Sequence, residues 1–317
     1  MGTVNEELLN TSRAVQLESF GGPEVLTIRE VPTPLAGPGH IRVRVAAAGL
    51  NPMDWFMTSD AETAARFGLS LPAGFGTDYA GVVDQVGEGV TGFALGDRVF
   101  GGALSRAVAN FVVVDAAGSV AANEAHHAPE GVDDRTAATL TIAGRTASAA
   151  LAVVNVGPND TVLIGGAAGG VGLFVVQLAC IAGARVIGTA SAASADFLRG
   201  LGAEPITYGY GLEDRVRTLA PDGITAAIDL FGTETAHAAR ALGVPDARIT
   251  TIAAQIDGIT PANGANATAG DLEKLARLVA SGRLSVPIAA SFPIEQIRAA
   301  VELQAGRHVK GKVVIDL

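Results

Sequence analysis

Residues 162–190 read VLIGGAAGGVGLFVVQLACIAGARVIGTA, and this stretch decides the fold. An apolar run at 162–164 breaks into glycine and alanine at 165–172, and an apolar segment that can wind as a helix begins at Leu173. A second apolar run follows at 184–188, the distance expected for a βαβ unit. The stretch therefore predicts a strand, a tight turn, a helix and a second, parallel strand.

The tight turn carries a dinucleotide-binding pattern. Residues 167–172 read AAGGVG, which is G-x-G-x-x-G with alanine in the first glycine position. Small residues here let the backbone turn sharply and approach a pyrophosphate, whose charge is stabilised by free N–H groups at the helix start. Such a pattern also arises by chance in glycine-rich chains, but the flanking strands and helix favour a cofactor site. The residues expected at the pyrophosphate are Ala168, Gly169, Gly170 and Val171.

The same segment is long and apolar enough to raise the alternative of a membrane span. Against that alternative, six glycines interrupt residues 161–184, no Lys or Arg flanks the segment before Arg185, and no aromatic belt is present. A buried parallel βα unit explains the segment better, and we expect no membrane insertion.

The end of the second strand indicates which dinucleotide binds. An NAD site usually has Asp or Glu about 20 residues beyond the glycines, where it binds the ribose 2′-hydroxyl. Here residues 188–194 read GTASAAS, with no acid before Asp196. The missing carboxylate removes repulsion against a 2′-phosphate and favours NADPH, and Arg199 is the nearest cation in the sequence. The polar residues at this end of the strand are Thr189, Ser191 and Ser194.

Composition bounds the class of protein. The chain has 317 residues and a net charge of −10, which allows two domains and gives no basic footprint for nucleic acid. Residues 1–12 lack the basic and apolar regions of a signal peptide, so we expect a flexible extension on a cytoplasmic protein. The one cysteine, Cys180, can form neither an internal disulfide nor a multi-cysteine zinc site.

The chain on either side of the glycine turn has different periodicities. Upstream, apolar and polar residues alternate from Arg13 and predict a β-rich domain, followed by a helix over 133–153. Downstream, strands alternate with helices and predict a parallel, doubly wound sheet. Ligands bind outside the carboxyl ends of such strands, so Phe231 and Ile252, after the fourth and fifth strands, should lie beside the cofactor. The final strand, within 309–317, is expected to return to the β-rich domain.

Several motifs support a family resemblance. They are GGPEVL at 21–26, AAAGLNPMDW at 46–55, GTDYAGVV at 76–83, GDRVFG at 96–101, the glycine turn and GKVVIDL at 311–317. Together they resemble the zinc-free quinone oxidoreductases, the zeta-crystallin-like group of the medium-chain dehydrogenase/reductase superfamily. The resemblance implies an NADPH-binding Rossmann domain at 141–270, inserted into a GroES-like catalytic domain made of 13–140 and 271–317. It also implies an active site in the cleft and a homodimer.

The resemblance predicts that no zinc ion is bound. Metal-dependent relatives carry a ligand cysteine at the position of Asn51 and Gly-His-Glu where this chain has Gly76-Thr77-Asp78, and their third ligand position falls near Ile142. Neither a thiolate nor an imidazole stands at these positions, and the cysteine-rich structural zinc loop is missing too.

Catalytic candidates follow from the same resemblance. Asn51 is implied to contact the nicotinamide ribose or the substrate oxygen, although Asn before Pro52 is also ordinary turn chemistry. Asp54 either orients Asn51 or caps the following helical turn. Tyr79 lies at the expected cleft and is a candidate general acid. Lys312 reaches the cofactor in the family pattern, but as a strand lysine it is expected to be solvated.

Two further cofactor contacts are implied. Thr146 matches a family position at the nicotinamide end, with a helix-interior threonine as the alternative. Tyr208 matches a position at the adenosine 2′-phosphate, with a core tyrosine at a strand end as the alternative.

The leading hypothesis is an NADPH-dependent, zinc-independent oxidoreductase that transfers a hydride to a quinone or an α,β-unsaturated carbonyl. One alternative is a structural or sensory protein that binds NADPH without turnover, because function lives in sites rather than folds. Another is a biosynthetic enoyl or ketone reductase with a specialised substrate.

Overall fold

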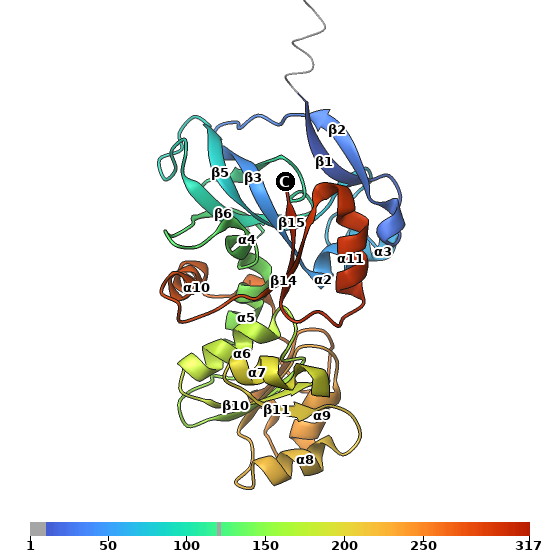
Figure 1. Cartoon of the computed structure of the whole chain (residues 1–317), viewed down its shortest axis with the longest axis vertical. Coiled ribbons are helices and arrows are strands. Elements are labelled where there is room, and N and C mark those ends of the chain that lie inside the picture. The colour runs from blue at the N-terminus through green and yellow to red at the C-terminus, as the bar shows by residue number, and fades with distance from the viewer. Residues whose placement is uncertain (1–10, 119–121) are drawn as a thin grey trace, which may run out of the picture.

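The computed structural model describes residues 11–118 and 122–317. Figure 1 shows two parts stacked along the long axis of the molecule. The upper part is rich in strands and contains segments from both ends of the chain, while the middle of the chain forms the lower, α/β part. This arrangement confirms the prediction of a parallel sheet inserted into a β-rich domain.

The lower part is built on five parallel strands in the order β11-β10-β9-β12-β13. Their bounds are β9 Thr161–Gly165, β10 Arg185–Ala190, β11 Glu204–Thr207, β12 Ala226–Asp229 and β13 Ile249–Thr251. The connecting helices are α6 Gly172–Ile181, α7 Ala195–Gly200, α8 Leu212–Leu219 and α9 Glu234–Ala241. The chain runs outward from β9 to β11 and then crosses to β12 on the other side of β9. Doubly wound sheets bind ligands in the crevice at such a reversal, and the glycine turn directly follows β9.

The upper part contains a larger sheet in the order β14-β15-β3-β5-β6-β8, with β7 also paired to β3. Its bounds are β3 His40–Leu50, β5 Asp78–Val86, β6 Arg98–Ala103, β7 Phe111–Asp115, β8 Asn123–His127, β14 Ile288–Pro293 and β15 Lys312–Asp316. A small sheet beside it comprises β1 Thr11–Leu17, β2 Thr27–Pro32 and β4 Ala73–Gly74. Because β15 pairs antiparallel with β3, the predicted return of the last strand is confirmed.

The helix α5, Thr141–Val153, joins the two parts. Its buried face belongs to a core cluster that also contains Phe100 of β6 and Ile164 of β9. A single helix over 133–153 is not what the structure shows, because α4, Asp134–Ala137, precedes α5 and is separated from it. The break lies against β3: a Cβ on Gly49 would lie 2.1 Å from the Ala138 carbonyl oxygen, so only glycine allows this approach.

The remaining elements are helices and short 3-10 turns. They are the helices α2 Pro52–Phe56, α3 Ala61–Arg66, α10 Asp271–Ala280 and α11 Ile297–Ala305 and the short 3-10 turns η1 Pro23–Val25, η2 Ala192–Ser194, η3 Asp246–Arg248, η4 Gly264–Asn266 and η5 Ile294–Gln296. Of the extension predicted for 1–12, residues 1–10 lie outside the described residues, whereas Thr11 and Ser12 begin β1. No helix in the described ranges is long and apolar enough to cross a membrane.

Candidate functional site

The glycine turn between β9 and α6 has the geometry that a pyrophosphate site needs. Gly166 adopts a φ of +67°, which favours glycine, and α6 begins at Gly172. A Cβ on Gly172 would lie 2.5 Å from the carbonyl oxygens of Gly166 and Ala167, so no side chain fits there. The Ala167 N–H donates to the Thr189 carbonyl oxygen at 3.2 Å, which ties the turn to β10. A phosphate can therefore approach the backbone closely at this helix start.

The end of β10 is polar and carries no carboxylate. Thr189 is buried, whereas Ser191 is exposed and its Oγ lies 3.1 Å from Ser194 Oγ. Arg199, the cation nearest in the sequence, forms an ion pair with Asp196 on its own helix. An adenosine ribose at this position would meet hydroxyl groups and no fixed negative charge.

Three predicted cofactor neighbours lie beyond the carboxyl ends of the parallel strands. Phe231 follows β12, is 60% exposed, and its Cβ would lie 3.3 Å from a Cβ on Gly166. Asp229 holds this loop by accepting hydrogen bonds from the backbone N–H groups of Phe231 and Gly232. Ile252 follows β13. Tyr208 follows β11 and is 55% exposed, so it is not a core tyrosine.

Above the turn, a buried polar network joins three separate segments of the chain. The Asn51 amide nitrogen donates to Asp78 Oδ2 at 2.9 Å, and Lys312 Nζ donates to Asn51 Oδ1 at 2.6 Å. Asp54 accepts from the Asn51 backbone N–H at 2.8 Å and from the Thr77 hydroxyl at 2.7 Å. All five side chains are buried. The bond from the Asn51 backbone to Asp54 is part of the capping box of α2, in which Asn51 is the N-cap residue, so the capping alternative for Asp54 is the one seen here.

Burial shifts the pKa values of the three ionisable side chains in this network, Asp54, Asp78 and Lys312. Loss of hydration raises the pKa of Asp54 to about 6, against the lowering effect of its hydrogen bond from Thr77. Loss of hydration likewise raises the pKa of Asp78 to about 7, and the Lys312 ammonium opposes this increase. Burial lowers the pKa of Lys312 itself. Two carboxylates facing one ammonium carry one excess negative charge when all are ionised, so protonation of one carboxylate neutralises the network.

The network and the glycine turn meet at one point. A Cβ on Gly170 would lie 3.3 Å from Lys312 Cδ and 3.9 Å from its Nζ, so this lysine borders the turn. Lys312 is thus buried, and the expectation of a solvated strand lysine is corrected. The physical reason is that β15 is an interior strand between β14 and β3.

The positions compared with zinc ligands also meet here. The Ile142 backbone N–H donates to Asp78 Oδ1 at 3.1 Å, and Asp78 contacts Asn51 directly. Within the described ranges, no group of three or more His, Cys, Asp or Glu residues is arranged to hold a metal ion. One turn further along α5, Thr146 Oγ1 donates to the Ile142 carbonyl oxygen at 2.7 Å, so Thr146 lies near the network on the same helix.

Tyr79 does not face the buried network. It is fully buried in the core of the upper part, and its hydroxyl donates to the Glu124 carbonyl oxygen at 2.9 Å. Loss of hydration raises the pKa of this hydroxyl above its ordinary value. A general acid must direct its proton at the substrate, so the geometry disagrees with Tyr79 as the proton donor.

Sequence reasoning missed Thr77 and Asp78 as members of the site and misjudged Lys312. The sequence carries part of the signal for Asp78, because its segment, Asn51 and Ile142 all match positions of zinc ligands in metal-dependent relatives. No local pattern marks Lys312, which is 261 residues away from its partner Asn51.

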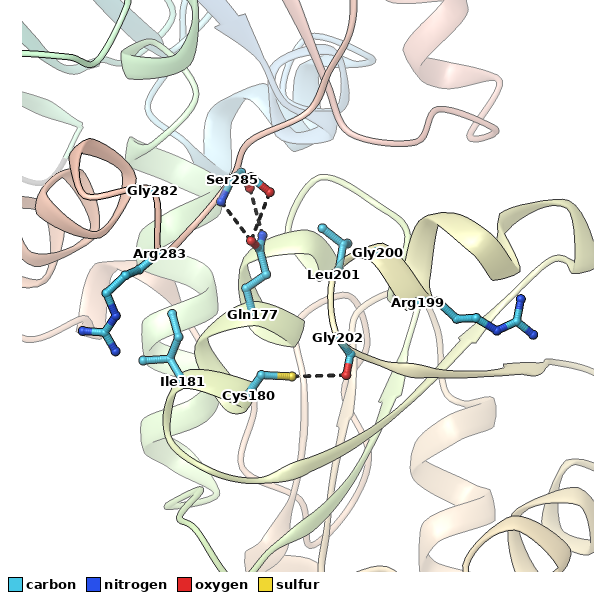
Figure 2. A pocket seen from close by; sticks show the side chains of 10 residues that line it. All are labelled: Gln177, Cys180, Ile181, Arg199, Gly200, Leu201, Gly202, Gly282, Arg283 and Ser285. Carbon is cyan, nitrogen blue, oxygen red and sulfur yellow. Dashed lines mark hydrogen bonds between the residues drawn. The ribbon is translucent and has the colours of Figure 1, made fainter.

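A separate cavity of about 470 Å³ lies between α6, α7 and the segment after α10 (Figure 2). It is lined by the second half of α6, which runs away from the ligand edge of the sheet. Within it, the backbone N–H of Ser285 donates to Gln177 Oε1 at 2.9 Å, and Arg199 points away from the other lining side chains. This cavity is therefore distinct from the glycine turn.

Comparisons with known proteins agree with this architecture. Residues 37–128 match the alcohol dehydrogenase GroES-like domain, and residues 201–315 match the zinc-binding dehydrogenase family. The quinone oxidoreductase from Coxiella burnetii has a similar structure, with a TM-score of 0.86 and 30% identity, over 97% of this chain and 99% of that chain. The chain belongs to the quinone oxidoreductase family of the medium-chain dehydrogenase/reductase superfamily.

The curated relatives match a shorter part of this chain than the solved structure does. The quinone oxidoreductase of Pseudomonas aeruginosa is 35% identical over 181 residues, which is 57% of this chain and 53% of that protein. The match thus spans about half the length of the curated relatives, so family membership alone does not assign a substrate.

Two solved structures differ in cofactor. A mycobacterial protein complexed with NADPH is 26% identical with a TM-score of 0.84, over 96% of this chain and all of that chain. An NAD-dependent alcohol dehydrogenase is 27% identical with a TM-score of 0.81, over 96% and 99%. Both proteins use a nicotinamide cofactor. Because one takes NADPH and the other NAD, similarity of fold alone does not choose between the two cofactors.

Proposed function

We propose that this chain is an NADPH-dependent oxidoreductase that transfers a hydride to a quinone or an α,β-unsaturated carbonyl without zinc. The observation that carries the proposal is the adjacency of Gly170 and Lys312, which brings the glycine turn and the buried network together. Bound NADPH would supply the hydride, and the protein would supply position and electrostatic stabilisation.

The glycine turn fits a dinucleotide on geometric grounds, because Gly172 and Gly166 leave backbone rather than side chains at the helix start. NADPH is favoured over NADH because no acid stands at the end of β10 to repel a 2′-phosphate. By resemblance, Thr146 would contact the nicotinamide end of the cofactor and Tyr208 the phosphorylated ribose.

Lys312 is the group best placed to stabilise negative charge that develops on the acceptor oxygen. An ammonium has three N–H donors, and two of them donate to Asn51 Oδ1 and to the Leu50 carbonyl oxygen at 3.2 Å. One donor is left, and the Nζ lies 3.9 Å from a Cβ placed on Gly170 in the turn. Fixed donors in a buried site stabilise such charge strongly because they need little reorganisation. Asn51 and Asp54 would then act by holding the lysine in place.

Zinc-independence rests on the donor groups. Asn51, Thr77 and Ile142 occupy the compared ligand positions, and none offers a thiolate or an imidazole. A quinone can accept its proton from water after hydride transfer, which suits a site whose tyrosine is turned into the core. Homodimerisation and a cytoplasmic location remain predictions from the resemblance.

The test is NADPH oxidation measured against a panel of simple quinones and enones, alongside nucleotide affinity. We expect steady turnover with quinones. Tight NADPH binding without turnover on any acceptor would contradict the proposal and favour a structural or sensory role. Turnover confined to a bulky enone would favour a biosynthetic reductase instead.

A further inference from the structure

The segment Lys310-Gly311-Lys312 lies beside the glycine turn between β9 and α6. A Cβ on Gly170 would lie 3.9 Å from the Gly311 carbonyl oxygen as well as 3.3 Å from Lys312 Cδ. Gly311 has a φ of +114°, and a Cβ there would lie 2.3 Å from the Pro287 carbonyl oxygen, so glycine is required between the two lysines. Lys312 is buried and reaches Asn51, whereas Lys310 is exposed.

Lys310 extends to the loop that follows β10. Its Nζ donates to the Ala193 carbonyl oxygen at 2.5 Å, although 117 residues separate the two in the sequence. Ala193 lies between Ser191 and Ser194, whose hydroxyl oxygens are 3.1 Å apart. In a doubly wound sheet the adenosine ribose lies at this loop, where an NAD-binding protein would place its carboxylate.

The ammonium of Lys310 has donors to spare. The Ala193 carbonyl takes one of its three N–H groups, and no carboxylate in the described part of the chain forms an ion pair with it. The other basic side chains of this region are engaged. Arg199 pairs with Asp196 at 2.6 Å, and Arg215 donates to the carbonyl oxygens of Thr207, Gly209 and Tyr210.

The neighbouring Glu234 and Arg307 also have partners. Glu234 accepts from the Gly209 backbone N–H at 2.6 Å. The Arg307 guanidinium lies 5.0 Å from the ring centre of Phe231 and 5.8 Å from that of Trp55, so it is directed towards the β12 side of the turn. Lys310 is therefore the available cation on the β10 side.

We propose that Lys310 binds the 2′-phosphate of the adenosine ribose and sets the preference for NADPH over NADH. The inference depends on the proposed function only for the class of cofactor. The Ser191 and Ser194 hydroxyls supply neutral hydrogen bonds beside the lysine, and the lysine supplies the charge. A charge-assisted hydrogen bond to a phosphate is about twice as strong as a neutral one.

The test is the affinity of the purified chain for 2′,5′-ADP and for 5′-AMP, measured by calorimetry at low and high salt. We expect Lys310→Ala to weaken 2′,5′-ADP binding by about tenfold to a hundredfold, and to change 5′-AMP binding by less than about twofold. Lys310→Arg should retain most of the 2′,5′-ADP affinity. Arg199→Ala, which removes a neighbouring but paired cation, is the matched control and should change neither affinity.

The outcomes separate the two proposals. Wild-type preference for 2′,5′-ADP that survives Lys310→Ala would overturn the role of Lys310 while leaving the proposed function intact. Equal affinity of the wild type for 2′,5′-ADP and 5′-AMP would also overturn the role of Lys310. Failure of the wild type to bind either nucleotide would overturn both proposals. Thermal unfolding of each variant checks that it is folded, as expected for an exposed position.

Discussion

The glycine turn and the buried network above it are built in opposite ways, although Lys312 borders both. The turn is made of consecutive residues and consists almost entirely of backbone, because Gly172 has no room for a methyl group. The network is made of polar side chains from three segments, and the single ammonium of Lys312 opposes the charge of its two carboxylates. The turn is therefore sensitive to volume and the network to charge, and substitutions should separate the two.

The largest expected effect is loss of the ammonium. Lys312→Met keeps the volume and removes the charge, which leaves Asp54 and Asp78 buried without a cation. An uncompensated buried charge costs about 3–5 kcal/mol of unfolding free energy, and we expect a loss of up to this size from urea denaturation at neutral pH. The matched control, Lys274→Met on exposed α10, should change stability by less than about 0.5 kcal/mol. A similar result for both variants would contradict the account of the network.

A methyl group in the turn should have the next largest effect. Gly172→Ala places a Cβ 2.5 Å from two carbonyl oxygens, and backbone must move to relieve this contact. We expect a loss of about 2–3 kcal/mol in unfolding free energy and weaker nucleotide binding. Gly200→Ala is the control, because nothing lies within 4 Å of a Cβ there. The interpretation of the turn fails if the Gly172 variant binds nucleotide as well as the Gly200 variant.

A smaller effect should appear as pH dependence. The pKa of Asp78 is raised from 3.8 to about 7, so the folded state holds a proton that the unfolded state releases. Its contribution to stability is present below about pH 4 and is lost as the pH rises through about 7. Asp78→Asn cannot ionise and does not suffer this loss. Its unfolding free energy relative to wild type should therefore rise by about 1–2 kcal/mol between about pH 5 and pH 8.

Unfolding measured at these two pH values checks the prediction for Asp78. A difference that stays constant would show that Asp78 is ionised at both, and that the network keeps its negative charge.

The smallest effect concerns cofactor choice at the end of β10. Ser191→Asp restores a carboxylate where NAD-binding proteins have one, and repels a 2′-phosphate. We expect the NADH/NADPH ratio of kcat/KM to rise by about tenfold, or about 1.4 kcal/mol. An unchanged ratio would remove Ser191 from the phosphate site and leave the turn and the network unaffected.

The glycine turn is contiguous in the sequence and the network is not, and this difference decides what the sequence could predict. The strand, turn and helix around Gly166 and Gly172 were predictable because their signal is contiguous and each small residue has a local geometric reason. The network was not, because Asn51 and Asp78 are 27 residues apart and Lys312 is 261 residues from Asn51. Only the sheet order, which places β15 beside β3, brings them together.

Tyr79 shows a different limit. Its neighbour Asp78 belongs to the buried network, but alternate side chains of a strand point to opposite faces of the sheet. Asp78 faces α5 and the network, so the next residue along β5 is directed into the core. The register of the strand decides this, and a single sequence does not reveal the register.

The most direct test of a single, metal-free site is the rate of NADPH oxidation with a quinone, measured on protein stripped with a chelator and assayed for zinc. We expect an undiminished rate in protein that contains no zinc. A rate that disappears with the metal and returns when zinc is added would contradict it.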